Sequence, residues 1–346
     1  MNGPDRDLNA CTASLRALLP LTASLAVSAY AHSRELGRLF TEQFTASDLT
    51  DNERLRDALG EISDCFSSEC LPNQNPYLAA ALSDPSDAGA RMASRRLVSA
   101  LGRTASASAC RVIAARLAAE KDDRGKTAAD KLLDRVFSFR PTGEKPTLVC
   151  PPGKLPEEAA GRFTAFLGSK RGAELGDDFV SAAQEVADGE SELCVLPIGN
   201  SSDGPLSSFR LLALRSGLVL CLACRVSADG GKSSSTFGMY SKNPVTLPPF
   251  RAPGQSYTEP ESFFSIVLPP SGEGEAGVGE LIETAEFFGL SLNNTASFPI
   301  SYTDGEYSLE LTFRVPFADP LALPAMAIYL SLFRPSFSLS GIYRMI

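Results

Sequence analysis

The sequence predicts an α+β protein of several domains, with an N-terminal helical bundle, an α/β lobe and a C-terminal ferredoxin-like unit. One observation is the length, because 346 residues exceed what one hydrophobic core usually organises. A second is a breaker cluster at residues 141–146, where helical stripes give way to short apolar runs. A third is the segment 244–260, which holds five prolines and no periodicity and therefore predicts a linker.

Residues 1–143 are rich in Ala, Leu, Arg and Ser, and their apolar side chains recur at the spacing of one helix face. This pattern is clear over Leu15–Ala29 and again over Leu132–Phe137. It predicts a helical bundle. The apolar stretch Leu18–Ala31 ends in small residues, as a secretory signal does, but balanced flanking charges and Pro20 favour an ordinary helix.

Residues 146–243 alternate between strand and helix patterns. The expected strands are 147–150, 193–198 and 218–226, and the expected helices are 157–166 and 179–188. Alternation of this kind predicts a parallel, layered α/β sheet.

Residues 260–346 carry most of a β-α-β-β-α-β order, which is typical of a ferredoxin-like unit. Strands are expected at 263–268, 290–298 and 307–315, and helices at 279–288 and 321–333. The run 307–315 alternates polar and apolar residues, which indicates a strand with one buried face.

The acidic excess lies in the C-terminal part of the chain. Residues 1–145 carry 19 basic and 19 acidic side chains, whereas residues 146–346 carry 13 and 22, and the net charge is −9. Such a surface repels phosphate backbones and anionic lipid, so we expect no nucleic-acid partner and no membrane partner.

The eight cysteines are scattered along the chain, which predicts buried, reduced thiols and a cytoplasmic protein. The one CxxC pair, Cys221 and Cys224, lies in a predicted strand, where residues three apart face opposite sides unless the strand bends. His32 is the single histidine. We therefore expect no metal site and no cofactor.

The most specific string is Val195–Gly204, read Val-Leu-Pro-Ile-Gly-Asn-Ser-Ser-Asp-Gly. It resembles the V-P-I-E-N-S-x-x-G signature of prephenate dehydratases. Upstream, Val149–Ala160 is similar to the opening L-G-P-x-G-S-x-S-x-x-A-A of the same family. Short polar side chains and backbone N–H groups at the end of a strand can converge on a carboxylate. The resemblance thus implies these ligand-binding residues: Pro151, Gly153, Asn200, Ser201, Ser202 and Gly204.

A second interpretation of the same turn is structural. Ser201, Ser202 or Asp203 can act as the N-cap of the helix that carries Phe209 and Leu212, because short oxygen-bearing side chains accept hydrogen bonds from the first turn of a helix.

Ser235 falls in register with the threonine of the T-R-F tripeptide that closes the family's catalytic domain. The resemblance gives Ser235 and Asn200 the catalytic roles and implies a periplasmic-binding-protein-like half. Only residues 227–234 stand where the family has its second lobe, and eight residues can turn a corner but cannot build a domain. Gly199 also replaces the acidic residue of the signature. The sequence thus predicts a truncated lobe with impaired catalysis.

The last unit resembles an ACT domain, the amino-acid-sensing module of these enzymes. Gly277-Val278-Gly279-Glu280-Leu281 stands in place of its G-A-L-V turn, and Ser297 and Pro299 persist from its E-S-R-P string. The resemblance implies a regulatory amino-acid site in a homodimer. Because Ala296 and Phe298 replace the charged members, an ACT-shaped dimerisation element without ligand stays the alternative.

The order of the segments is similar to that of bifunctional chorismate mutase/prephenate dehydratase proteins. It gives a helical domain at 1–143, a prephenate-dehydratase-like domain at 146–243 that lacks most of the second lobe, and an ACT-like domain at 260–346. Ala29 and Phe40 stand in place of an arginine and the lysine of the mutase, so a helical bundle with solvated arginines is favoured over an active mutase.

Three functions follow from these observations. The first is a non-catalytic or impaired relative that binds a small carboxylate or amino acid, with prephenate and phenylalanine as the candidates. The second is a working dehydratase completed by its dimer partner, and the third is a structural or interaction protein.

Overall fold

The computed structural model describes residues 107, 110–119, 121–123, 125–141, 147–169, 172–228, 233–247, 261–270, 272, 275–299, 307–316 and 318–346. The chain divides into two compact units, Met1–Ala128 and Ala129–Ile346. In the first unit, residues 110–119 form a helix whose buried face carries Cys110, Ile113, Ala114 and Leu117. The chorismate-mutase-like positions, His32 and most of the predicted bundle lie outside the described residues, so these stay predictions.

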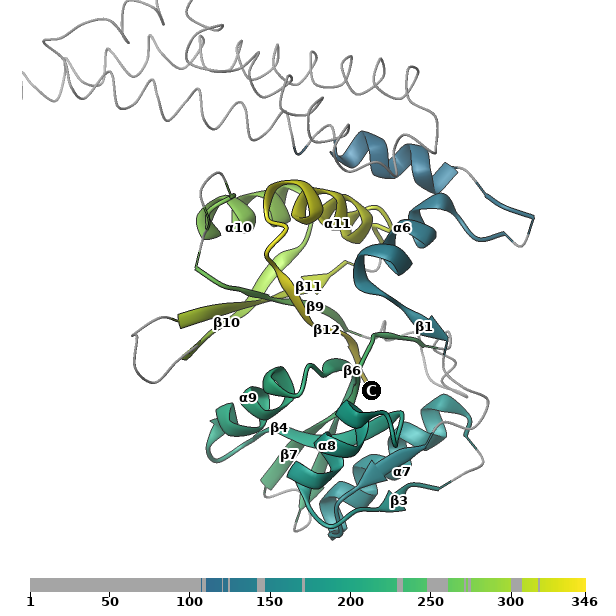
Figure 1. Cartoon of the computed structure of the whole chain (residues 1–346), viewed down its shortest axis with the longest axis vertical. Helices are drawn as coiled ribbons and strands as arrows, with labels where there is room; N and C mark the ends of the chain where they lie inside the picture. Colours follow the sequence, from purple (N-terminus) through teal and green to yellow (C-terminus); the bar gives the residue numbers. More distant parts are fainter. Residues whose placement is uncertain are drawn as a thin grey trace, which may run out of the picture. The chain divides into compact units, whose positions relative to one another are not determined.

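The second unit is built on one large mixed sheet with helices packed against it (Figure 1). Its strands are β2 (Leu148–Cys150), β3 (Glu174–Leu175), β4 (Leu193–Asn200), β5 (Gly204–Pro205), β6 (Val219–Ala228), β7 (Ser233–Ser241), β9 (Ser262–Leu268), β10 (Ser291–Pro299), β11 (Tyr307–Val315) and β12 (Ser338–Met345). The order across the sheet is β10-β11-β9-β12-β6-β7-β4-β2-β3, and β5 pairs with β4. A separate parallel pair joins β1 (Arg140–Pro141) to β8 (Val245–Thr246).

The helices of this unit are α6 (Ala128–Phe137), α7 (Lys154–Leu167), α8 (Phe179–Asp188), α9 (Ser207–Arg215), α10 (Val278–Phe287) and α11 (Ala322–Phe333). In β4, Leu193 and Val195 enter the core cluster shared with α7, whereas Cys194 and Leu196 enter the cluster shared with α8 and α9. Alternate residues of one strand thus face opposite helical layers, as strand geometry requires. The part of the sheet around β4 therefore has helices on both faces, which is a three-layer α/β/α arrangement.

The predicted strands β2, β4 and β6 run in the same direction, and β2 pairs in parallel with β3 and β4, but the prediction of a wholly parallel sheet is wrong because of β7. Strand β7 runs antiparallel to both β4 and β6. The sheet is therefore mixed, because β6 and β7 join as a hairpin and not through a helical crossover.

The C-terminal strands continue the same sheet. Strand β12 pairs antiparallel with β9 and parallel with β6. Helices α10 and α11 lie side by side over the strands β9–β12 (Figure 1). The predicted boundary between 146–243 and 260–346 therefore falls within one unit and one sheet, and the division into two domains stays a prediction. No helix among the described residues is long and apolar enough to cross a membrane.

The CxxC pair lies in β6 at a β-bulge. The pairing of β6 with β7 shifts register between Leu220 and Leu222, which places Cys221 and Cys224 in the same core cluster. The expected opposite-facing arrangement is therefore wrong, because a bulge resets the alternation of a strand. Both thiols are free, and no group of three metal-ligating side chains occurs in the described part of the chain.

The described thiols are expected to resist alkylation in the folded protein. Burial raises the pKa of Cys150, Cys221 and Cys224 to about 12, which leaves little of the reactive thiolate at pH 8. We expect iodoacetamide to label them at least about tenfold more slowly in buffer than in urea, where the thiolate is accessible. Peptide mass spectrometry resolves each site, and equal rates in both conditions would contradict the buried placement.

Candidate functional site

The two residues predicted to be catalytic lie opposite one another. Asn200 at the end of β4 pairs with Ser235 near the start of β7, and Gly199 pairs with Thr236. Because β4 is antiparallel to β7, the C-terminal end of one strand meets the N-terminal end of the other at one edge of the sheet. Two residues 35 positions apart in the sequence are thus neighbours across the β4–β7 pair, and their catalytic roles stay a prediction.

Asn200 closes the turn that follows it. Its Oδ1 accepts hydrogen bonds from the backbone N–H of Ser202 at 2.9 Å and of Asp203 at 2.6 Å. Its Nδ2 donates to Oδ2 of Asp203 at 2.8 Å. The amide group of Asn200 and the backbone N–H of Ser202, both at predicted ligand-binding residues, are therefore engaged within this exposed turn, which is the ordinary behaviour of an Asx-turn.

Ser201 fastens the turn to β7. Its backbone N–H donates to the carbonyl of Ser234 at 2.8 Å, and its Oγ accepts from the backbone N–H of Ser234 at 3.0 Å. Helix α9 begins after Leu206, which makes no side-chain cap. The alternative in which Ser201, Ser202 or Asp203 is the N-cap of this helix is therefore wrong.

Gly199 stands where the family signature has an acidic residue, and the backbone explains the glycine. A Cβ at this position would lie 2.9 Å from the carbonyl oxygen of Gly204, because β5 folds back closely on β4. No side chain fits there without a shift of the hairpin. Gly204 itself has φ +73°, a conformation that favours glycine.

Pro151 and Gly153 lie in the loop between β2 and α7, at the edge of the sheet where the parallel strands β2 and β4 both end. Pro151 is buried. Gly153 has φ +144°, and its N–H donates to Oε1 of Glu157 at 2.8 Å. This donor is therefore also occupied by the protein itself.

The segment in place of the family's second lobe is the end of a β-hairpin. Strands β6 and β7 pair without interruption from Leu222 opposite Met239 to Ala228 opposite Ser233. Only four residues connect the last paired positions. This hairpin and β4 therefore form the end of the sheet that carries Asn200 and Ser235.

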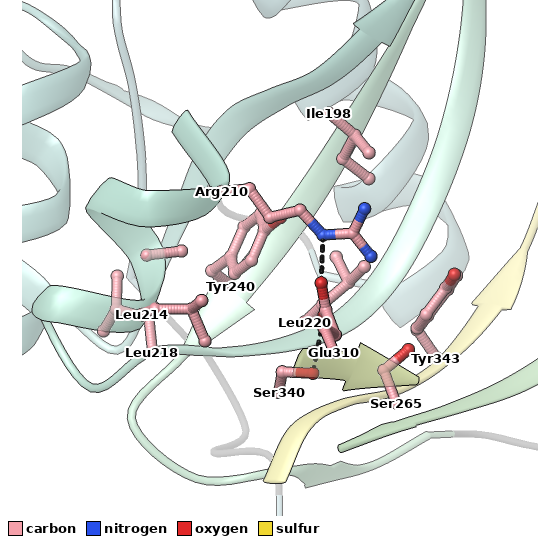
Figure 2. A pocket seen from close by; sticks show the side chains of 11 residues that line it. Ile198, Arg210, Leu214, Leu218, Leu220, Tyr240, Ser265, Glu310, Ser340 and Tyr343 are labelled. Atoms are coloured by element: carbon pink, nitrogen blue, oxygen red, sulfur yellow. Dashed lines mark hydrogen bonds and ion pairs between the residues drawn. The ribbon is translucent and has the colours of Figure 1, made fainter. Parts of the chain in front are cut away.

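A small cavity lies beneath α9, between this helix and the sheet (Figure 2). It measures about 30 Å³. Its apolar lining comes from Ile198, Leu214, Leu218 and Leu220, and its polar lining comes from Arg210, Tyr240, Ser265, Glu310, Ser340 and Tyr343. Within the motif string Val195–Gly204, Ile198 is the residue that contributes to this lining.

A buried ion pair dominates the cavity. Nε of Arg210 on α9 lies 2.6 Å from Oε2 of Glu310 on β11, and the two side chains are 18% and 4% exposed. Oγ of Ser340 donates to Oε1 of Glu310 at 2.7 Å. Nη2 of Arg210 donates a hydrogen bond to Oγ1 of Thr312 at 3.4 Å. The same Oγ1 also accepts a hydrogen bond from Oγ of Ser265 at 2.9 Å.

The sequence places these groups through the period-2 pattern of β11. Leu311 and Phe313 are fully buried apolar residues, and Glu310 and Thr312 alternate with them. The polar pair faces α9, since Arg210 contacts both side chains. The sequence signal for this site was a charged residue, Glu310, between the apolar residues Leu309 and Leu311 of the strand. Arg210, Glu310 and Ser340 were not predicted.

The buried Tyr240 and the half-buried Tyr343 border the ion pair. Burial raises the pKa of Tyr240, and it raises that of Tyr343 to about 12. The neutral phenol of Tyr343 is therefore favoured in the folded state. Its ring stacks on Phe263 with centroids 5.1 Å apart.

The raised pKa of Tyr343 predicts a loss of stability at alkaline pH. Above pH 10 the unfolded chain loses the phenol proton while the folded protein keeps it up to about 12, so the free energy of unfolding falls across this window. Tyr343 is expected to account for about 1.4 kcal/mol of the fall in the free energy of unfolding at pH 11. Urea unfolding at pH 9 and pH 11 measures it.

Tyr343→Phe should make the loss at pH 11 smaller by about 1.4 kcal/mol, and the remainder comes from other buried groups with raised pKa values, such as Tyr240 and Cys221. Tyr307→Phe, at a side chain that is 59% exposed, serves as the matched control. A Tyr343→Phe variant with the same pH dependence as the parent would contradict the assignment.

The predicted ACT site is distributed over two elements. Gly277 is the N-cap residue of α10, Leu281 is buried, and Glu280 accepts a hydrogen bond from the Tyr329 hydroxyl at 2.8 Å. Ser297 and Pro299 lie on β10, opposite Leu309 and Tyr307 of β11. Regulatory binding by these residues stays a prediction.

Among known proteins, the chain is similar to several solved structures. No protein-family model matches the chain, and no curated protein matches it. It is similar to the prephenate dehydratase from Streptococcus mutans, with 14% identity, a TM-score of 0.43 and coverage of 58% of this chain and 98% of that one. For the prephenate dehydratase from Arthrobacter aurescens in complex with L-Phe, the values are 14%, 0.40, 57% and 89%. For GqqA, described as a novel type of quorum quenching acylase, they are 18%, 0.38, 57% and 94%.

Proposed function

We propose that this chain is a non-catalytic relative of the prephenate dehydratases that binds a small carboxylate or amino acid. The observation that carries the proposal is the hairpin of β6 and β7, which pairs through to Ala228 and Ser233 where the resemblance requires a second lobe. The motif strings around Pro151 and Asn200 support the relationship, and the missing wall argues against turnover.

The chemistry explains why one wall is insufficient. Prephenate must lose carbon dioxide and hydroxide together, so the leaving hydroxyl needs a positioned proton donor in a site that excludes water. Ser235 supplies a hydroxyl, and Asn200 lies opposite it. The amide of Asn200, however, is held by Ser202 and Asp203 in an exposed turn.

The test is prephenate turnover by the purified full chain, followed as phenylpyruvate formation. We expect no conversion above the uncatalysed rate. Conversion at an enzyme-like rate, lost in both Asn200→Ala and Ser235→Ala, would instead support a working dehydratase completed by a second copy of the chain. Thr236→Ala, at the next position of β7, is the matched control for Ser235→Ala.

A ligand panel tests the binding half of the proposal. Thermal unfolding is measured with phenylalanine, tyrosine, prephenate and chorismate, because a ligand that binds the folded state raises the unfolding temperature. Reproducible stabilisation by one of them supports the proposal. A flat response to these and to small amino acids favours a structural or interaction protein, and sedimentation then tests the proposed homodimer.

A further inference from the structure

Helix α9 is anchored more firmly at its end than at its start. Ala213, in the second half, is buried, and its carbonyl accepts a hydrogen bond from the N–H of Leu218 at 2.8 Å. The first half begins after Leu206, which makes no side-chain cap, and its first two residues are exposed. The N–H of Arg210 reaches the carbonyl of Leu206 at 3.3 Å, which is long for a helix. The first half therefore depends on its side chains for attachment.

The neighbouring helix α8 shows what α9 lacks. Its N-cap residue Asp178 accepts a hydrogen bond from the N–H of Ser181 at 2.7 Å, and the helix buries three side chains. Helix α9 has no such cap and buries one side chain. A helix with few buried contacts and an uncapped end opens locally at a small cost in free energy. Of these two helices, α9 is therefore the one that opens more easily, and it opens from its first half.

Phe209 and Arg210 attach the first half of α9 to the rest of the unit. The ring of Phe209 packs edge-on against Phe179 of α8, with centroids 5.1 Å apart, and both rings are half-buried. Nε of Arg210 lies 2.6 Å from Oε2 of Glu310 on β11. Glu310 is 4% exposed and also accepts from Oγ of Ser340, so it is a fixed point in the sheet. The ion pair thus joins an easily opened segment to a rigid one.

We infer that residues 207–210 form a lid over the cavity beneath α9, and that the ion pair of Arg210 with Glu310 is its latch. The lid opens by unwinding of this half of the helix, while Ala213 stays in the core. Figure 2 shows Arg210 reaching from α9 to Glu310 beside the cavity. With the lid closed, the cavity of about 30 Å³ has room for about two water molecules, so a larger solute reaches its polar lining only after the lid opens. The inference does not depend on the proposed function.

Hydrogen exchange of the full chain tests the latch. In a helix the N–H groups of Leu211 and Leu212 bond to the first two residues of the lid, so their exchange reports its opening. Arg210→Gln removes the charge from the latch and should accelerate this exchange at least about tenfold. Arg215→Gln makes the same change at an exposed residue of the same helix and should leave the exchange unchanged. An equal acceleration over residues 179–188 of α8 would show a loss of overall stability and no latch.

A second pair of variants tests the lid in the stabilising direction and does not require Arg210→Gln to fold. Leu206→Asp supplies the N-cap that α9 lacks. Leu206→Ala removes the same side chain without supplying a cap and is the matched control. Exchange at Leu211 and Leu212 should be about fivefold slower in Leu206→Asp than in Leu206→Ala, because a cap holds the first turn closed. Equal exchange in the two variants would contradict an opening that starts at the first turn.

Cysteine labelling tests whether the lid gives access to the cavity. Ser265 lines the cavity and is 3% exposed, whereas Ser241 lies outside the lining and is 8% exposed. Static exposure therefore favours labelling of Ser241→Cys, whereas an opening lid favours labelling of Ser265→Cys. We expect iodoacetamide to label Ser265→Cys at least about tenfold faster, and peptide mass spectrometry separates each site from the native thiols. Labelling of Ser265→Cys at or below the rate of Ser241→Cys would overturn the lid.

Discussion

Replacing Glu310 with alanine is expected to lower the free energy of unfolding by about 3 kcal/mol, because it leaves the guanidinium of Arg210 without a charge partner beneath α9. Ser340 also loses its acceptor, which lies 2.7 Å away in the folded protein. The value is at the lower end for a broken buried pair, since Arg210 is 18% exposed and part of its charge reaches water. Urea unfolding of the full chain measures it.

The exposed ion pair Arg314–Glu261 provides the matched control. Its atoms are 2.7 Å apart, much as in the buried pair, but its side chains are 56% and 50% exposed. Glu261→Ala should therefore cost less than about 1 kcal/mol. The double variant Arg210→Met/Glu310→Leu should recover most of the loss, because apolar groups remove the cost of buried charge. Equal losses in Glu310→Ala and Glu261→Ala would show that burial does not decide the effect.

Replacing Arg334 with methionine is expected to lower the free energy of unfolding by about 2 kcal/mol. Arg334 is 1% exposed at the end of α11, where Nη1 lies 3.2 Å from Oε2 of Glu275 and donates to the carbonyl of Ala276 at 3.3 Å. Nη2 donates to the carbonyl of Pro269. Methionine fills similar space but leaves these acceptors without a donor, so the loss reports hydrogen bonding and not a cavity.

Hydrogen exchange locates the effect of Arg334→Met. The segment that Arg334 holds leads directly into Gly277 and α10, so faster exchange is expected over residues 275–281. Arg162→Met is the control, because Arg162 is 45% exposed and pairs with Glu158 in the same helix. Unchanged exchange over 275–281 in the Arg334 variant would contradict a role in ordering this turn.

Much of the local structure could be predicted from the sequence. Helix α8 has the predicted bounds Phe179–Asp188, and strand β11 has the predicted bounds Tyr307–Val315. In both elements the apolar residues recur with a clear period, and residues that favour a start or a stop mark the ends. Asp178, for example, caps α8, since its Oδ1 accepts a hydrogen bond from the backbone N–H of Ser181 at 2.7 Å. Strand β12, Ser338–Met345, was not predicted, because its mixture of Ser, Gly, Arg and Leu gives no clean alternation.

The candidate site could be predicted only in part. The motif strings singled out Asn200 and Ser235, but they did not indicate that these residues pair across β4 and β7, because the strand that carries Ser235 was not predicted. The pairing of Arg210 with Glu310 joins residues 100 positions apart, and the period of α9 or β11 alone does not indicate which elements meet. The internal bonds of the turn at Asn200 depend on backbone geometry that composition does not specify.

The position of β12 has a consequence for synthesis on the ribosome. Residues 338–345 fill the place between β6 and β9, although both neighbours emerge from the exit tunnel long before them. Until then, each of these two hydrophobic strands presents an open edge, and such edges recruit other chains. The nascent protein therefore passes through an aggregation-prone stage that ends when β12 closes the gap.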